Sequence, residues 1–383
     1  MIQSRRHFVT LAAGALVSGC ATTAPVAVGE ESLSSPLQPR GRRLVLAPVA
    51  VSEDRVIRVV AGLRPFRPQG FVVRAEALGA KVLVHNYGHG GGGITLSWGT
   101  SDLAVGLGFA GPERAYGVLG CGAVGLATAR LLQRRGGLVT IYAKDLPPQT
   151  TSNIAGGQWW PSTVFDASAA SAAFRAQFER AARLAYAHFQ PLVGDRYGVR
   201  WTRNYEISNR RGSAGSLFTT LADITPEGRF LEPGEHPFGD AAVHQYDTMM
   251  VEPPVYLQAM VDDFLAAGGK IVVREFRTPA DVQALPEPVV FNCTGLGARP
   301  LFGDEALTPV RGQLVVLLPQ PEVTYNLLSG SAYMFPRRDG IVLGGTYDRG
   351  VWDTEPDPAI TARILADHRR LFGRMQRPAT EAA

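Results

Sequence analysis

Residues 116–130 read YGVLGCGAVGLATAR, an apolar strand followed by a glycine turn and the start of a helix. The turn has the spacing G-x-G-x-x-G, with Gly120, Gly122 and Gly125 at its fixed positions. In such a turn the first glycine makes the bend and the second lets backbone approach a pyrophosphate. The third lets the helix pack closely on the strand. The pyrophosphate then lies at the helix start, where backbone N–H groups are unpaired.

A second strand and an acid follow this turn. Residues 138–143 are apolar and predict a strand, and Asp145 lies 20 residues after Gly125. A carboxylate at this distance binds a ribose hydroxyl of a nucleotide. Together these features predict a dinucleotide site, and a glycine turn that arose by chance is the alternative. The 115 residues that precede Tyr116 are unusual, because such a strand and turn ordinarily open their domain.

The composition is that of an ordinary globular protein. The 383 residues allow two domains, and 45% are hydrophobic and 19% charged. The formal net charge is +4, but the arginines are scattered, which predicts a solvated surface and no nucleic-acid partner. Cys121 and Cys293 fall in or beside predicted buried strands, so a disulfide framework is not expected.

The first residues have the form of an export signal. Arg5 and Arg6 make a twin-arginine motif, and the apolar stretch 9–19 is too short to span a membrane. The sequence LVSGC then ends at Cys20 and resembles a bacterial lipobox. It predicts cleavage before Cys20, a lipid on its thiol, and a membrane-anchored protein on the periplasmic side. Plain cleavage with Cys20 incidental is the alternative, and residues 21–40 are typical of a flexible tether.

Two unusual motifs precede the glycine turn. Arg64 and Arg67, in GLRPFRP, lie between prolines that fix φ, so their side chains are directed. A guanidinium fork suits a carboxylate because it can bond both oxygens, and two surface arginines in a proline turn are the alternative. Residues 85–95, HNYGHGGGGIT, bring glycine backbone close to a flat ligand ahead of a helix. His85 and His89 are four residues apart, but the glycines exclude a helix there, so we expect no shared metal ion.

Hydrophobic periodicity divides the rest of the chain into alternating helices and strands, followed by a β-rich region. It predicts helices at 101–109, 168–190, 253–267 and 357–372, a loop at 227–239, and strands at 55–61, 81–85, 201–208, 216–221, 270–273, 289–291, 311–318, 332–335 and 341–346.

Taken together, the motifs resemble the D-amino-acid oxidase family of FAD-dependent enzymes. They are RPFRP, HNYGHGGGGITLSWG, GCGAVG, IYAKD, TTSNIAGGQWWP, NCTG, RGQ, AYMFP and GGTY, and HNYGHGG is the most specific. The match spans nearly everything from 55 to 372. In the family, however, RP-x-RP and HNYGHGG lie near the C-terminus, whereas here they come first. The resemblance therefore implies a circular permutation, in which residues 110–115 join the family's original ends.

The resemblance implies an α/β fold with two discontinuous domains. A Rossmann-like FAD-binding domain would comprise 69–165 and 251–308, and a β-rich substrate domain with a mixed sheet would comprise 41–68, 166–250 and 309–373. The family's acidic ribose ligand aligns with Lys144, so a one-residue shift would let Asp145 take that role. The implied FAD contacts are Gly90, Gly93, Ile94, Thr95, Gly120, Gly122, Ala123, Val124, Gly125, Lys144, Asp145, Thr150, Thr151, Ser152, Gly156 and Gly157.

Three residues carry the implied catalytic roles. Arg64 would bind the substrate carboxylate with help from Tyr333, and the Gly91 carbonyl would accept a hydrogen bond from the substrate amine. Ser329 stands where vertebrate members have a second active-site tyrosine, and Trp160 stands where some members have glutamine. Both departures bear on the substrate range.

The implied reaction is oxidative deamination of a D-amino acid, with O₂ as the electron acceptor. Three alternatives remain from the sequence: a D-aspartate oxidase type of specificity, a membrane-tethered dehydrogenase that reduces a quinone, and an FAD-binding lipoprotein without turnover. The oligomeric state is open.

Overall fold

A computed structural model describes residues 41, 43–112, 114–208 and 215–375. The predicted export signal, Cys20 and the tether lie outside these residues. Within the described part of the chain, no helix combines the length and the apolar character needed to cross a membrane.

A six-stranded sheet surrounds the glycine turn, with strand order β2-β3-β10-β4-β5-β9. Its strands are β2 (Val72–Leu78), β3 (Lys81–Tyr87), β4 (Ala115–Leu119), β5 (Leu138–Ala143), β9 (Lys270–Val273) and β10 (Val289–Asn292). All neighbours pair in parallel except β2, which runs antiparallel to β3 at the edge. The helix α2 (Ala123–Arg134) connects β4 to β5, which is the expected crossover between parallel strands. The Rossmann-like sheet expected from the sequence is therefore present.

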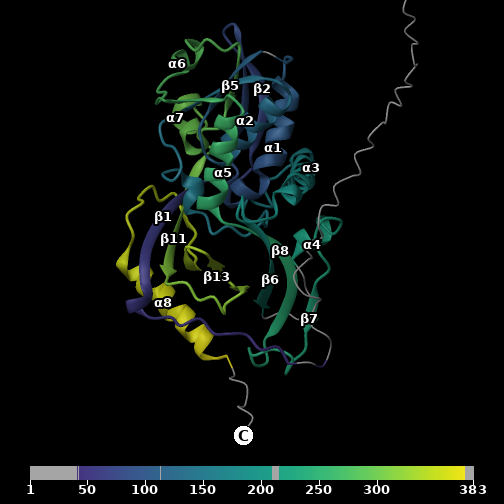
Figure 1. The fold of residues 1–383 in the computed structure, drawn as a ribbon, viewed down its shortest axis with the longest axis vertical. Helices are drawn as coiled ribbons and strands as arrows, with labels where there is room; N and C mark the ends of the chain where they lie inside the picture. The colour runs from purple at the N-terminus through teal and green to yellow at the C-terminus, as the bar shows by residue number, and fades with distance from the viewer. Residues whose placement is uncertain (1–40, 42, 113, 209–214, 376–383) are drawn as a thin grey trace, which may run out of the picture. The chain divides into compact units, whose positions relative to one another are not determined.

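Helices pack beside this sheet. They include α1 (Gly93–Gly108), which contacts both α2 and α3 (Ala172–Phe189), and α5 (Pro253–Ala266), which contacts α2 (Figure 1). The helix α1 begins at Gly93, eight residues before the predicted start at 101. Burial explains the difference, because Ile94, Leu96 and Trp98 all lie in the core. Their packing outweighs the low helix propensity of the glycine run.

The second sheet has nine strands in the order β1-β11-β14-β13-β12-β6-β8-β7, and β15 pairs with β11. It is mixed, because β12 pairs with β6 in parallel and every other pair is antiparallel. The helix α8 (Pro358–Gly373) contacts β11, β13 and β14. The strands are β1 (Val56–Phe66), β6 (Val199–Ser208), β7 (Arg229–Leu231), β8 (Ala242–Val251), β11 (Thr308–Leu317), β12 (Tyr325–Ser329), β13 (Ala332–Arg337), β14 (Gly340–Gly344) and β15 (Asp348–Arg349).

The chain before the glycine turn is shared between the two sheets. The strand β1 lies along β11 over its whole length, with Arg64 opposite Val310 (Figure 1). By contrast, β2, β3 and α1 belong with the six-stranded sheet. Residues 56–87 therefore contribute strands to both sheets.

Some predicted elements are wrong or incomplete. The strand predicted at 216–221 is the short helix α4 (Ser216–Thr220), in which Phe218 packs on Trp160 and Tyr246 with ring centroids 4.6 and 4.7 Å away. The predicted loop at 227–239 contains β7, which pairs with β8. Neither β2 nor β8 was predicted. Among the described residues, the remaining short helices are α6 (Pro279–Gln283), α7 (Ala298–Phe302) and five 3₁₀ turns at 53–55, 90–92, 151–154, 190–192 and 295–297.

Candidate functional site

A cavity of about 1680 Å³ brings together residues from both sheets. All of the predicted site residues line it except Gly125, and Trp160 lines it as well. Gly125 instead lies behind the turn, where a Cβ atom would come within 2.1 Å of the Gly120 carbonyl oxygen. It thus lets helix and strand pack closely, as the third glycine of the motif should.

The glycine turn forms one wall of the cavity and is open to an anion. Gly120 has a φ of 106°, which favours glycine at this bend. Gly122 caps α2 without a side chain, and the Ala123 N–H donates to the Ser152 hydroxyl at 3.1 Å. A Cβ atom at Gly122 would lie 3.0 Å from that hydroxyl and would fill the cradle. The helix start with its glycine cap and the open turn fit the pyrophosphate of a dinucleotide.

Two oppositely charged residues, Lys144 and Asp145, directly follow the strand β5. The side chains of Lys144 and Asp145 are 65% and 54% exposed, and the nearest N and O atoms are 3.9 Å apart. Both residues line the cavity, so either can reach a ligand. The assignment of Asp145 as the ribose ligand stays a prediction.

Arg64 reaches the cavity from β1. Its Nη1 donates to the Thr346 carbonyl at 3.1 Å, and its guanidinium crosses Gly312, where a Cβ atom would lie 2.4 Å from Nη1. No aspartate or glutamate of the described chain forms an ion pair with Arg64. This half-buried cation therefore has donors left for an anionic ligand.

Arg67 has a different environment although it is only three residues away. Its Nε donates to Asp304 Oδ2 at 2.8 Å and its Nη1 to the Gly70 carbonyl at 3.1 Å. The Tyr87 hydroxyl donates to the same carboxylate at 2.8 Å. Burial alone would raise the pKa of Asp304, but the hydrogen bonds from Tyr87 and Arg67 outweigh it and hold that pKa below its ordinary value. Arg67 thus bonds to the protein itself.

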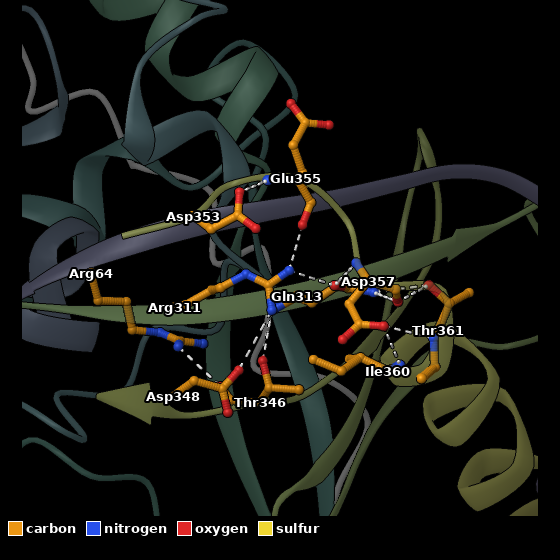
Figure 2. Close-up of polar contacts among 11 residues, drawn as sticks. Arg64, Arg311, Gln313, Thr346, Asp348, Asp353, Glu355, Asp357, Ile360 and Thr361 are labelled. Carbon is orange, nitrogen blue, oxygen red and sulfur yellow. Dashed lines mark hydrogen bonds and ion pairs between the residues drawn. The ribbon is translucent and has the colours of Figure 1, made fainter. Parts of the chain in front are cut away.

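A hydrogen-bonded chain anchors the carbonyl that Arg64 contacts (Figure 2). The Thr346 hydroxyl accepts from the backbone N–H of Gln313 at 2.8 Å. The Gln313 amide group in turn donates to the Asp357 carbonyl at 2.9 Å and to the Thr361 hydroxyl at 2.8 Å, at the start of α8. Its side-chain oxygen accepts from the Asp357 N–H at 2.8 Å. The segment that holds Arg64 is therefore fixed to β11 and α8.

The neighbouring Arg311 anchors the same segment at a second point. It is 4% exposed and donates to the Glu355 carbonyl at 2.6 Å (Figure 2). Its Nη1 also lies 3.7 Å from a carboxylate oxygen of Asp348. Residues 346–357 are thus tied to β11 by two side chains of the RGQ motif.

Tyr333 approaches the cavity from β13. Its ring stacks on Phe335 with centroids 4.8 Å apart and also packs against Gly344 and Gly345. The hydroxyl has no hydrogen-bond partner among the described residues, so it can bond to a ligand. The Tyr333 backbone is held from behind, where His368 Nε2 lies 3.0 Å from its carbonyl oxygen.

The two histidines of HNYGHGG are structural. His89 is buried against Thr100, with Nε2 2.9 Å from that hydroxyl, and burial lowers its pKa to about 3. His85 Nε2 lies 3.0 Å from a Glu76 oxygen, and its Nδ1 lies 2.9 Å from the Asn292 amide nitrogen. No group of three His, Cys, Asp or Glu in the described ranges could hold a metal ion.

Sequence reasoning missed Thr163, which lines the cavity beside Gly91. Thr163 is the one described residue other than glycine with a positive φ, at 54°. Nothing in the local sequence predicts this, because threonine is β-branched and disfavours that conformation. Thr346 was missed too, since its role depends on contacts with strands distant in sequence.

Comparison with known proteins identifies the family of this chain. Residues 116–382 match the DAO family model, described as FAD dependent oxidoreductase. The chain is 32% identical over 254 residues to a D-amino-acid oxidase of Rubrobacter xylanophilus, which covers 65% of this chain and 74% of the relative. A D-aspartate oxidase of Homo sapiens is 30% identical over 263 residues, which are 65% of this chain and 73% of that relative.

Solved structures share the fold at lower identity. A glycine oxidase from Geobacillus kaustophilus superposes with a TM-score of 0.53 at 18% identity, covering 70% of this chain and 81% of the other. A glycine oxidase from Bacillus cereus gives 0.51 at 18% identity, covering 67% and 77%. Because the family model matches more than half of this chain, the chain belongs to the DAO family of FAD-dependent oxidoreductases.

Proposed function

We propose that this protein catalyses the oxidative deamination of a D-amino acid to a 2-oxo acid and ammonia, with O₂ reduced to H₂O₂. Arg64 is the observation that carries the proposal. Its guanidinium lies in the same cavity as the glycine turn and has no acidic partner in the described chain. A carboxylate ligand would supply that partner through two parallel hydrogen bonds.

The residues around Arg64 suit an amino acid. The unpartnered Tyr333 hydroxyl offers a second donor to the carboxylate, and the Gly91 carbonyl would accept from the amine. Bound FAD supplies a two-electron acceptor to such a site. The protein's own contribution is to hold the substrate in one orientation, and positioning of this kind is a large part of many enzymatic rate enhancements.

We also infer that the chain is a circular permutation of its family. Two observations support this. The family match begins at Tyr116, the start of the first dinucleotide-binding strand, and leaves the preceding residues unmatched. Those residues nevertheless contribute β1 to one sheet and β2, β3 and α1 to the other. Domain ends often lie close together, so such a rewiring can leave the core intact.

We further propose export and anchoring through Cys20. The support is the sequence of the first 20 residues alone. Cys20→Ser should move the protein from the membrane fraction to the soluble fraction without a change in FAD content. If Cys20→Ser stays membrane-bound, the lipid assignment is wrong.

The deamination proposal can be tested with the chain purified from Ala21. D-amino acids, neutral and acidic, are added anaerobically, with each L-enantiomer as the matched control. Bleaching of the flavin by at least one D-enantiomer is the expected result. A preparation that holds FAD but is bleached by none would instead be a binding protein without turnover. Once bleaching is seen, O₂ uptake with H₂O₂ release separates an oxidase from a quinone-reducing dehydrogenase.

A further inference from the structure

Thr163 holds a backbone conformation that its own side chain opposes. Its φ of 54° lies in the left-handed region, and every other positive φ in the described chain belongs to glycine. For a β-branched residue such a φ is a genuine outlier. Strain of this kind persists where the surroundings over-determine it, and it clusters at ligand sites.

The strain places Thr163 against the turn that carries Gly91. The Thr163 carbonyl accepts a hydrogen bond from the Gly91 N–H at 3.1 Å. Its Oγ1 lies so close that a Cβ atom built on Gly91 would be 2.1 Å from it. Both residues are exposed and line the cavity. The Thr163 hydroxyl thus lies beside Gly91, the residue whose carbonyl is assigned to the substrate amine.

This hydroxyl has no hydrogen-bond partner among the described residues. Of the other threonines that line the cavity, Thr151 and Thr354 also lack a side-chain hydrogen bond in the described chain, but neither has a positive φ. Others are bonded. The Thr150 hydroxyl donates to Asn153 at 2.8 Å, and the Thr346 hydroxyl accepts from Gln313 at 2.8 Å. A strained residue of the cavity wall thus carries a polar group that the described chain does not use, and a ligand could supply its partner.

We propose that the Thr163 hydroxyl accepts a hydrogen bond from the substrate amine, next to the Gly91 carbonyl. The inference rests on the proposed deamination. An amine that will form a C=N bond must first be neutral, with two N–H groups and one lone pair. Two acceptors, one for each N–H, fix the direction of that lone pair, whereas one acceptor leaves it free to rotate. Thr163 would therefore contact the substrate directly.

The test compares ligands and variants in pairs. The ligands are benzoate and 2-aminobenzoate, which differ by one amine beside the carboxylate, and dissociation constants come from titration of flavin absorbance without turnover. The variants are Thr163→Ser, which keeps the hydroxyl, Thr163→Val, which keeps the shape, and Thr163→Gly, which relieves the strain. Thr324→Val, at an exposed threonine outside the cavity, is the control.

We expect Thr163→Val to weaken 2-aminobenzoate by about 3- to 10-fold, the loss of one hydrogen bond, and to leave benzoate unchanged. Thr163→Ser should bind both ligands like the wild type. Thr163→Gly should likewise weaken 2-aminobenzoate and leave benzoate unchanged. Its melting temperature should rise, because glycine adopts this φ without strain. Equal affinities in wild type and Thr163→Val for 2-aminobenzoate would overturn the inference.

A second comparison separates this inference from the function on which it rests. Bleaching of the wild type by a D-amino acid tests the deamination alone. If bleaching occurs but Thr163→Val binds benzoate and 2-aminobenzoate with the same affinities as the wild type, only the role of Thr163 is wrong. If no D-amino acid bleaches the wild type, the deamination fails and the assignment of Thr163 falls with it.

Discussion

The two arginines of RPFRP have nearly the same sequence surroundings and opposite environments. Each precedes a proline on the same proline-rich stretch. Arg67 meets Asp304, 237 residues away, and the Gly70 carbonyl, whereas Arg64 meets one carbonyl of Thr346. The proline rings direct both side chains, but the distant chain decides which cation is neutralised by the protein. The difference separates a stabilising arginine from a ligand-binding one.

The largest expected effect is on ligand binding at Arg64. A charge-assisted bidentate pair contributes roughly 1.5–3 kcal/mol, and more when its loss leaves a charge unpaired. Arg64→Ala should therefore weaken the binding of a carboxylate substrate by on the order of ten- to several-hundred-fold. Arg64→Lys should recover only part, since an ammonium cannot make two parallel bonds. FAD content, measured by absorbance, should not change. Loss of substrate reduction in Arg67→Ala with retention in Arg64→Ala would reverse the assignment.

Arg67→Ala should act on stability. It leaves the Asp304 carboxylate, 12% exposed, without its cation. We expect a loss of about 1–3 kcal/mol in the free energy of unfolding, measured by urea denaturation. Since the folded pKa of Asp304 lies below 3.8, the pair stabilises the fold above that pH and stops doing so as pH falls through the lowered pKa. The deficit of Arg67→Ala should accordingly be full at neutral pH and shrink in acid. An equal deficit in strong acid would contradict this account.

Tyr333→Phe should have a smaller effect than Arg64→Ala. It removes one hydroxyl donor and keeps the ring that stacks on Phe335. One hydrogen bond to a charged group corresponds to about ten-fold in substrate affinity, with stability unchanged. An affinity loss as large as that of Arg64→Ala would mean that Tyr333 and not Arg64 is the main carboxylate contact.

Thr346→Val should give the smallest change. It removes the hydroxyl that accepts from the Gln313 N–H and keeps the carbonyl that accepts from Arg64. We expect a rise of about 2- to 5-fold in KM from a loosened Arg64, with kcat nearly constant. Thr346→Ser is the matched control and should behave like the wild type. A fall in kcat with constant KM would show that Thr346 acts elsewhere.

Local sequence predicted the elements whose pattern is carried by a few adjacent residues. The strands β5 and β9 begin and end where they were expected, and the glycine turn lies between β4 and α2. The strand β8 was not predicted, because all ten of its residues are buried and no alternation marks its two faces. The buried residues include the polar His244, Gln245 and Asp247. For α4, the aromatic contacts of Phe218 outweighed local propensity.

The candidate site divides in the same way. Residues on recognisable motifs, such as Arg64, Tyr333 and Gly91, could be named from the sequence and lie in one cavity. Thr163 could not, because its conformation contradicts its own propensity and is imposed by packing from elsewhere. Thr346 depends on a contact 282 residues away in sequence, which no local pattern records.

The position of β1 at the start of the chain has a kinetic consequence. Arg64 can meet Thr346 only when a loop of 282 residues closes, and β1 must find β11 across nearly as much chain. Closing such a long loop costs chain entropy before any stabilising contact forms, which makes the formation of these contacts slow. We therefore expect β1 to dock late in refolding. The glycine turn, whose strand and helix are adjacent in sequence, should become protected from hydrogen exchange before the arginine that completes the site.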